Sequence, residues 1–257
     1  MESSSRSVQA SVRRCAGVAV AALMTAAAPS CGVPGIVSAT PAGACEHTAA
    51  LENDWGVPDR EDGFDTKASL SNWHLYEGIG HAGNGKRTPK AISVSDGVLT
   101  ITGDGSGDSG GMGWNAGQHF GRWEVCVRSP QSAPGYHSVV LLWPDAEDWP
   151  VGGEVDFMEA IEPTRQVVEG WMHYGADDRR VGAQVSVDAT QWHAWAVEWT
   201  PEKITYFLDG TPWWTSTNTA NFPPRSLHLC LQVDDFGGDI AAGGRQLVDW
   251  VRQYSLP

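Results

Sequence analysis

The 257-residue sequence has few basic residues, almost no helical periodicity and no long apolar segment. Lysine and arginine together number 17 against 31 acidic residues, a net charge of −14, and they form no basic patch. A nucleic-acid partner is therefore not expected, because phosphate binding depends on neutralisation by these side chains. The apolar run "CAGVAVAALMTAAAP" near the start is shorter than the about 20 residues of a spanning helix, so no membrane span is predicted.

The first thirty residues have the pattern of a secretory signal peptide. Arg6, Arg13 and Arg14 precede the apolar run, and small residues follow it. Removing residues 1–30 leaves 14 basic and 30 acidic residues, a net charge of −16. We therefore predict a secreted, extracellular protein. Lipid anchoring at Cys31, which follows "AAAPS", is the less favoured alternative.

Beyond this segment the chain divides into a leader and one domain. Residues 31–50 are small and rich in Gly, Pro and Ala, which predicts a flexible leader. Residues 51–257 are long enough for a single all-β domain with a sizeable core, which we expect to be monomeric. An exported protein can oxidise its cysteines, and the four outside the signal peptide permit three pairings. They are Cys31, Cys45, Cys126 and Cys230.

Period-two alternation of apolar and polar residues runs through the domain and predicts β-strands. It is clear in "WHAWAVEWT" at 192–200 and in "SLHLCLQVD" at 226–234, and Asp209-Gly210 marks a hairpin turn. "SVVLLW" at 138–143 predicts a strand covered on both faces. Many short strands without helical segments indicate a β-sandwich, in which the polar faces of several strands line a groove.

The stretch "GGEVDFMEA" places three acids in an otherwise apolar run. On a regular strand Glu154 and Asp156 point to one face and Glu159 to the other. A β-bulge at Phe157–Met158 would return Glu159 to the face of the other two. Like charges held that close raise at least one pKa, which yields a protonated acid beside an ionised partner, as retaining glycoside hydrolysis requires.

Two other interpretations of the three acids remain possible at this point. The run could be an acidic surface strand in an acidic protein, or it could bind calcium. Calcium ligands usually come from loops with Asp, Asn and Gly, whereas this run is apolar and strand-like, which favours catalysis.

The sequence resembles family-16 glycoside hydrolases. "GGEVDFME" is similar to their Glu-x-Asp-x-x-Glu signature in the bulged, laminarinase-like form. "GRWEVCVRSP", "WPVGGEVDFME", "HYG", "WHAWAVEWTPEKITYFLDG" and "VDWVRQY" are also similar to family segments, in the same order over about residues 60–255. The resemblance implies a concanavalin-like β-jelly-roll sandwich with a substrate cleft on its concave face.

Carried over to this chain, the resemblance implies a role for each acid. Glu154 is expected to be the nucleophile and Glu159 the acid/base. Asp156 is expected to lie between them and to form a hydrogen bond with the nucleophile. Glu124 matches a cleft acid that binds sugar hydroxyls. Two residues further the family often has an arginine, and here stands Cys126. An arginine would offer forked hydrogen bonds, so weaker binding of distal sugars is expected.

Thirteen tryptophans are available to stack on sugar rings or to fill the core. Trp149 precedes the acid strand in a Pro/Asp-rich loop, matches a family cleft position and is expected to stack on substrate. Trp143 and Trp114 are further candidates for substrate binding. Trp195 and Trp199 lie on an apolar strand face and are expected in the core.

Other polar candidates follow from the same patterns. His173 matches a family cleft position and is expected to orient Asp156 or the sugar, and Gln232 is expected to bind substrate from the polar face of its strand. His137, His173 and His193 lack metal-ligand spacing, so no catalytic metal is predicted. No cofactor is required, although Asp249 matches a position near the optional structural calcium of the family.

Cys126 and Cys230 raise a question of pairing. Cys126 shares a face with Glu124, and Cys230 shares one with Gln232. If both faces line the groove on neighbouring strands, a disulfide could join them. Two unbonded thiols are the slightly preferred alternative.

The sequence thus predicts a retaining endo-hydrolase of β-linked polysaccharide, with β-1,3-glucan as the favoured substrate. One alternative is a family-16 relative that acts on mixed-linkage glucan or galactan, or as a transglycosylase. A non-catalytic β-sandwich lectin is the alternative from another class, since fold alone does not determine function. The intact acid triplet argues against a lectin, because binding needs neither a nucleophile nor a proton donor.

Overall fold

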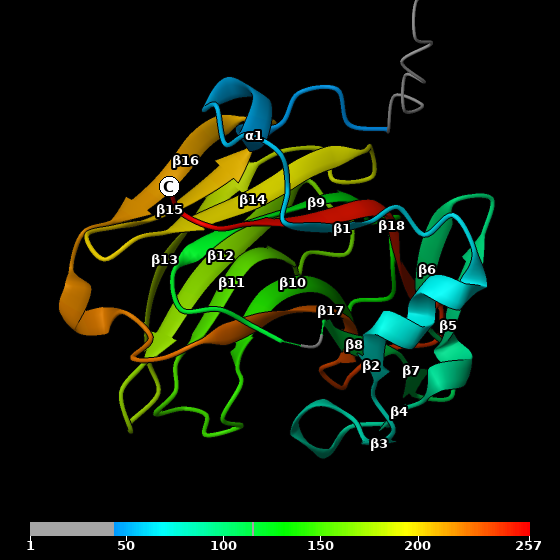
Figure 1. Cartoon of the computed structure of the whole chain (residues 1–257). Helices are drawn as coiled ribbons and strands as arrows, with labels where there is room; N and C mark the ends of the chain where they lie inside the picture. Colours follow the sequence, from blue (N-terminus) through cyan, green and yellow to red (C-terminus); the bar gives the residue numbers. More distant parts are fainter. Residues whose placement is uncertain (1–43, 115) are drawn as a thin grey trace, which may run out of the picture. The chain divides into compact units, whose positions relative to one another are not determined.

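The computed structural model describes residues 44–114 and 116–257, and the predicted signal peptide, residues 1–30, lies outside them. The described part is all-β, as predicted, with two antiparallel sheets packed face to face (Figure 1). Within these ranges no helix is long and apolar enough to cross a membrane. We call the two layers the outer sheet and the cleft sheet.

The outer sheet has eight strands in the order β16-β15-β14-β9-β18-β6-β5, and β1 also pairs with β18. Their bounds are β1 (Arg60–Asp62), β5 (Ile92–Ser95), β6 (Val98–Gly103), β9 (Gly121–Arg128), β14 (His193–Trp199), β15 (Ile204–Leu208), β16 (Thr211–Ser216) and β18 (Gly244–Tyr254). The turn predicted at Asp209-Gly210 joins β15 to β16, with φ of 48° and 80° at these residues.

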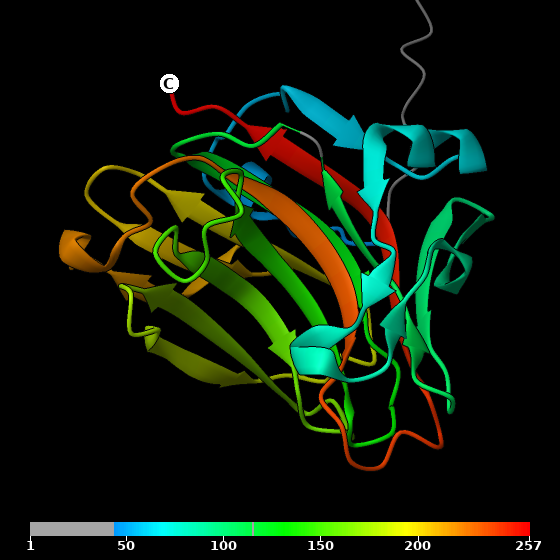
Figure 2. The same ribbon diagram turned by 90° about the horizontal axis from the view of Figure 1, so that it is seen from below.

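The cleft sheet has seven strands in the order β13-β12-β11-β10-β17-β8-β2 and is strongly curved (Figure 2). Their bounds are β2 (Trp73–Leu75), β8 (Gly111–Trp114), β10 (Tyr136–Pro144), β11 (Glu154–Ala160), β12 (Val167–Tyr174), β13 (Arg179–Ser186) and β17 (Leu227–Asp235). Strand β11 carries the acid triplet and lies between β10 and β12, so the acids are central in the sheet.

Short elements complete the described chain. A small third sheet holds β3 (Gly78–Ile79), β4 (Lys86–Arg87) and β7 (Asp108–Ser109). The helical segments are α1 (Ala49–Glu52) and the 3-10 turns η1 (Lys67–Asn72), η2 (His81–Gly83), η3 (Pro89–Ala91) and η4 (Thr219–Asn221). We call residues 78–87, which contain β3, η2 and β4, the lip.

Alternating apolar residues of both sheets form one core between the layers. Trp195 and Trp199 of β14 are 0% exposed, as predicted for this apolar face. Leu229 and Leu231 of β17 meet them from the other sheet as part of the same cluster. The opposite, polar face of β17 is thereby directed away from the core and is available to the cleft.

The end of the predicted leader is structured, which corrects the boundary at residue 50. Cys45 is bonded to Cys126 of β9, with Cα atoms 5.9 Å apart. Three residues later, the Thr48 side chain accepts a hydrogen bond from the Leu51 N–H and caps helix α1. Ala49 packs in an apolar cluster on the outer sheet, so residues 44–50 belong to the domain.

Candidate active site

A β-bulge brings the three acids of β11 to one face, as the sequence predicted. The register shifts between Asp156 and Glu159 leave Phe157 without a cross-strand partner. Phe157 and Met158 are both fully buried in the core. Because the bulge adds one residue, Glu159 returns to the face of Glu154 and Asp156, and all three line one cleft.

The cleft lies on the cleft sheet and has a volume of about 970 Å³. Its floor comes from the outward faces of β10, β11, β12 and β17, and the lip forms part of its wall. The residues of β10, β11, β12 and β17 that line it are Val139, Leu141, Trp143, Glu154, Asp156, Glu159, His173, Cys230, Gln232 and Asp234. Such a volume lies at the upper end of the about 300–1,000 Å³ that ligand pockets occupy.

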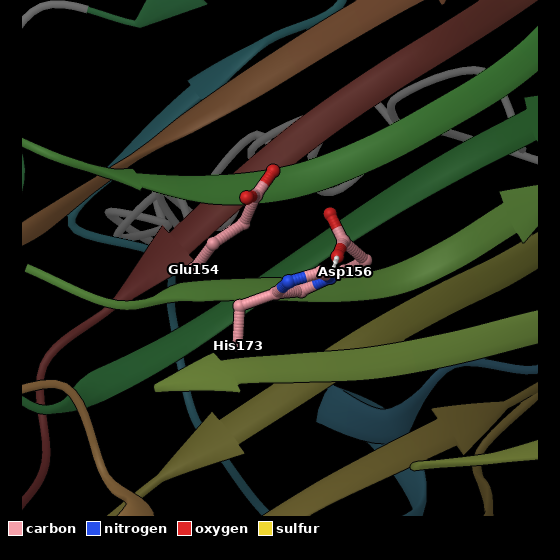
Figure 3. A group of neighbouring side chains, drawn as sticks. All are labelled: Glu154, Asp156 and His173. Carbon is pink, nitrogen blue, oxygen red and sulfur yellow. Dashed lines mark ion pairs between the residues drawn. The ribbon is translucent and has the colours of Figure 1, made fainter. Parts of the chain in front are cut away.

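His173 lies between two carboxylates beside the acid triplet. Its Nε2 is 3.4 Å from Asp156 Oδ2, and its Nδ1 is 2.7 Å from Asp178 Oδ1. Figure 3 shows the Asp156 carboxylate over the His173 ring and Glu154 beside them. The prediction that His173 orients Asp156 is therefore consistent with its position.

The same three side chains could hold a cation. Ligand atoms of Glu154, Asp156 and His173 all lie within 4.8 Å of one another, as in Figure 3. Two carboxylates and an imidazole are ligands that zinc and other transition metals accept. The absence of a catalytic metal therefore stays a prediction, to be tested with metal analysis.

Burial controls the protonation of the two central acids. Burial raises the pKa of Glu154 to about 8; the Glu159 charge adds to the rise, whereas hydrogen bonds with Trp149 and Asp156 lower it. Burial also raises the pKa of Asp156 well above its usual range, and the charges of Glu154 and Glu159 add to this. Their mutual hydrogen bond raises the pKa of Asp156 and lowers that of Glu154, which favours Asp156 as the holder of a shared proton.

Besides His173, three predicted substrate-binding residues line the cleft. Trp143 and Trp149 stack with ring centroids 6.2 Å apart and planes 12° apart, and Trp149 is 41% exposed. Gln232 is 7% exposed, and its side-chain oxygen has no hydrogen-bond partner in the protein. These positions offer apolar ring faces and an unused acceptor to a ligand.

Two predicted cleft residues lie elsewhere. Glu124 is on β9 of the outer sheet, is 0% exposed and accepts a 2.5 Å hydrogen bond from the Ala49 N–H, so its predicted contact with sugar is wrong. Trp114 is 3% exposed and stacks on Trp73 at 5.2 Å in the core, so its cleft role is wrong as well. Trp114 is on β8 of the cleft sheet but on its core face, whereas Glu124 was misplaced because the sequence does not tell which sheet a strand joins.

The same error affects the cysteines. Cys126 was expected beside the groove, but β9 and β17 belong to different sheets, so Cys126 cannot meet Cys230. Instead Cys126 pairs with Cys45, and Cys230 is a buried free thiol in the cleft floor. Cys126 therefore does not lie beside the cleft, and the prediction that it weakens the binding of distal sugars no longer follows.

The structure also brings residues into the cleft that the sequence analysis did not select. Arg87 of the lip bonds Asp234 of β17 through Nη2 at 2.5 Å and Nε at 3.1 Å. The Tyr76 hydroxyl lies 3.1 Å from Cys230 Sγ, and the Tyr76 ring covers Gly111, where a Cβ would meet it at 2.6 Å. Asp234 could have been found, since it shares the face of Gln232 two residues earlier, whereas the lip contacts depend on tertiary structure.

The fold and the site together define a class, a β-sandwich with an acid-lined cleft on one sheet. Residues 82–252 match the profile of glycosyl hydrolases family 16, which is more than half of the chain. The chain therefore belongs to glycosyl hydrolases family 16, and the resemblance stated from its motifs is confirmed.

Two relatives agree with this assignment. The chain is 31% identical over 151 residues to a "Beta-glucanase" of Rhodothermus marinus, covering 51% of each protein. It is 26% identical over 187 residues to the "Endo-1,3-1,4-beta-glycanase ExsH" of Rhizobium meliloti, covering 64% of this chain and 40% of the relative. The chain thus spans about half or less of these relatives.

The fold is shared with solved laminarinases. The laminarinase from Rhodothermus marinus superposes with a TM-score of 0.69 at 24% identity, over 77% of this chain and 96% of that one. The LamAcat structure from Zobellia galactanivorans gives 0.69 at 19% identity, over 79% and 100%. At these identities the likeness concerns the fold, and the jelly-roll architecture is confirmed.

Proposed function

We propose that the protein is a secreted, retaining endo-glycoside hydrolase that cleaves β-linked glucan, with β-1,3-glucan as the favoured substrate. The observation that carries the proposal is the bulge in β11, which turns Glu154, Asp156 and Glu159 to one face of a cleft. Binding alone does not require three acids crowded on one face of a strand, because their mutual repulsion raises the free energy of the folded state.

In the proposed reaction, the Glu154 carboxylate attacks the anomeric carbon while Glu159 protonates the leaving oxygen. The C–O bond to the leaving sugar breaks, and a glycosyl–enzyme ester forms. Glu159, now a carboxylate, removes a proton from water, and the water oxygen displaces Glu154. Two inversions at one carbon give net retention of the β configuration.

Asp156 serves the nucleophile in this scheme. A proton held on Asp156 lets it donate a hydrogen bond to Glu154, and this bond favours the ionised Glu154 that the attack requires, against the burial that raises the pKa of Glu154 to about 8. His173 contacts the Asp156 carboxyl group and is itself held by Asp178. The pair therefore keeps Asp156 in place as the charge on Glu154 disappears and returns.

Substrate is proposed to bind across the exposed rings and the free acceptor of the cleft. Trp143 and Trp149 present parallel faces to the C–H groups of sugar rings. Gln232 offers its unpartnered oxygen to a sugar hydroxyl. An acceptor that is buried and unpaired costs free energy, which a bound hydroxyl would recover.

The charge of the cleft favours neutral polymers. The ionisable acids and arginines that line it are Glu77, Glu147, Glu154, Asp156, Glu159, Asp178 and Asp234 against Arg87 and Arg180. Arg87 is already paired with Asp234. Sulfated or uronic polysaccharides would meet a like charge here, so an uncharged glucan fits better than a sulfated galactan.

Mixed-linkage glucan is the closest alternative substrate, because one relative is described as an endo-1,3-1,4-β-glycanase. Galactan cleavage and transglycosylation use the same acids and remain alternatives. A lectin would bind polysaccharide without releasing new reducing ends.

Export and cofactor content are also proposals. The Cys45–Cys126 disulfide is typical of proteins outside the reducing cytosol and favours secretion. No cofactor enters the proposed reaction. For the calcium considered near Asp249, the described residues give no cluster of three acidic or histidine ligands there, and one Asp249 oxygen bonds the Ala44 N–H. The surroundings of Asp249 thus do not fit a carboxylate-rich calcium site.

The test is incubation of the protein with laminarin, mixed-linkage glucan, agarose and a sulfated galactan while new reducing ends are measured. We expect the fastest cleavage on laminarin, with oligosaccharides rather than single sugars as early products. Binding of laminarin without cleavage would favour the lectin, and faster cleavage of another polymer would replace the proposed substrate.

A further inference from the structure

A stack of three aromatic rings stands at one end of the cleft. The Phe236 ring lies between His81 of the lip and His137 of β10, with centroids 4.0 Å and 3.8 Å away and planes 25° and 19° apart. Phe236 and His81 line the cleft, whereas His137 lies behind them and is 8% exposed. The stack therefore holds the plane of the His137 ring.

Within that plane, one ring nitrogen of His137 points at Glu159. His137 Nδ1 is 3.6 Å from Glu159 Oε1, and it has no hydrogen-bond partner in the protein. Both side chains are largely buried, at 11% and 13% exposure. A buried ring nitrogen without a partner costs free energy, and the Glu159 carboxylate can accept a hydrogen bond from Nδ1–H once the 3.6 Å separation shortens.

We propose that His137 is a positioning residue for Glu159, whose Nδ1–H stabilises the carboxylate that forms when Glu159 gives up its proton. The inference rests on the acid/base role proposed for Glu159. His137 does not line the cleft, so it acts through Glu159 and does not touch the sugar.

The His137 Nδ1–H stabilises Glu159 most strongly after the first proton transfer. The Glu159 proton moves to the leaving oxygen, and the new carboxylate gains a charge-assisted hydrogen bond from His137 Nδ1–H. When Glu159 later takes a proton from water, this bond weakens again. No proton leaves His137 in either step, so the balance of the reaction is unchanged.

Other charged groups surround the ring and must be kept constant in a test. Asp234 faces His137 across the β10–β17 register, and Arg87 neutralises it from the lip. The titratable and charged groups next to His137 or its stacking partners are Glu159 on β11, Asp234 and Asp235 on β17, Arg87 on β4 and His81 on η2, and β11 also carries Glu154 and Asp156. None of these is altered by a change at position 137.

Two substitutions separate the hydrogen bond from the stack. His137→Phe keeps an aromatic ring against Phe236 but removes the N–H. His137→Asn keeps an N–H near the position of Nδ1 but removes the ring. The matched control is His119→Phe, because His119 stacks on Phe120 at 3.9 Å and 21° but is exposed and away from the acid triplet.

The first readout is the titration of the Glu159 carboxyl carbon by NMR in protein with ¹³C-labelled glutamate, assigned with Glu159→Gln. In His137→Phe the midpoint should move to higher pH by about one pH unit, since the ionised carboxylate loses a charge-assisted hydrogen bond. His137→Asn and His119→Phe should leave the midpoint near that of the wild type. A merely structural role for His137 would not move the midpoint while the melting temperature is preserved.

The second readout is kinetic. His137→Phe should lower kcat on β-glucan about tenfold or more, with KM little changed, and should slow activated aryl glycosides much less. An unmoved Glu159 midpoint in folded His137→Phe overturns the inference, whatever the activity. Absence of cleavage by the wild type would instead overturn the proposed function, because the NMR titration reads the His137–Glu159 contact without any substrate.

Discussion

Strands β9 and β11 both bury carboxylates, but they do so on opposite sheets and with opposite consequences. Glu124 of β9 is sealed under helix α1, where the Ala49 N–H bonds one oxygen. Glu154 and Asp156 of β11 face a cleft of about 970 Å³ and share a hydrogen bond with each other. The Ala49 N–H occupies one oxygen of Glu124, whereas the carboxyl groups of Glu154 and Asp156 are open to a ligand in the cleft.

The comparison shows that burial and a raised pKa do not by themselves identify a catalytic acid. Burial raises the pKa of Glu124 to about 7, against lowering contributions from hydrogen bonds with Ala49 and Ala50 and from Arg252. The pKa of Glu154 is raised by burial in the same way. What separates them is access to the cleft and the presence of neighbouring acids, both of which depend on the sheet that each strand joins.

The largest expected effect is that of Glu154→Gln. The amide cannot form the glycosyl–enzyme bond, so kcat on laminarin should fall by about 10⁴-fold or more while laminarin binding is retained. The matched control is Glu124→Gln, the same change on the outer sheet, which should keep its activity. Substantial turnover by rigorously purified Glu154→Gln would remove the nucleophile from this position.

Glu159→Ala should reduce activity on polysaccharide by about 10²–10⁴-fold, because the leaving oxygen receives no proton. Aryl glycosides with good leaving groups should be affected far less, since their departure needs little protonation. Azide should accelerate the variant and give a β-glycosyl azide. An α product would indicate inversion and a different role for Glu159.

Cys45→Ser should lower the free energy of unfolding by about 2–4 kcal/mol, because the disulfide closes a long loop between the N-terminal segment and β9. Activity at 25 °C should be retained, since the bond lies on the outer sheet. Chemical denaturation measures the change, and non-reducing peptide mapping should recover Cys45 linked to Cys126 and Cys230 alkylated. A Cys126–Cys230 peptide would contradict the strand arrangement.

An effect of similar size, seen as a slope against pH, is expected for the stability of Glu124→Gln. The folded-state pKa of about 7 lies above the usual value of 4.5, so the wild type loses stability as pH rises between these values. At about 1.4 kcal/mol per pKa unit, the glutamine variant should gain on the wild type by a few kcal/mol between pH 4.5 and pH 8. Melting temperatures across this range measure the slope, and parallel curves for the two proteins would mean that Glu124 is not a buried acid of raised pKa.

The local alternation of apolar and polar residues was enough to predict the strands and the bulge in β11. Alternation assigned the core faces of β14 and β17, and the two- and three-residue spacings of the acids required an extra residue at Phe157–Met158. These features depend on side-chain direction along one strand, which the sequence records directly.

Contacts between strands distant in sequence were not predictable in the same way. The rule that Glu124 and Cys126 share a face is correct, but that face lies under the N-terminal segment rather than over the cleft. The Arg87–Asp234 and His137–Glu159 contacts join residues from different strands, and no spacing in the sequence records them. Which sheet a strand joins is decided by packing of the whole chain.

The central claim is that the bulged acid strand cleaves β-glucan with retention. It is tested most directly by ¹H NMR of the anomeric protons in the first minutes of laminarin hydrolysis, before mutarotation mixes the anomers. The account predicts that the β anomer of the new reducing end appears first and the α anomer grows in later. An α anomer that appears first would contradict the double displacement by Glu154 and Glu159.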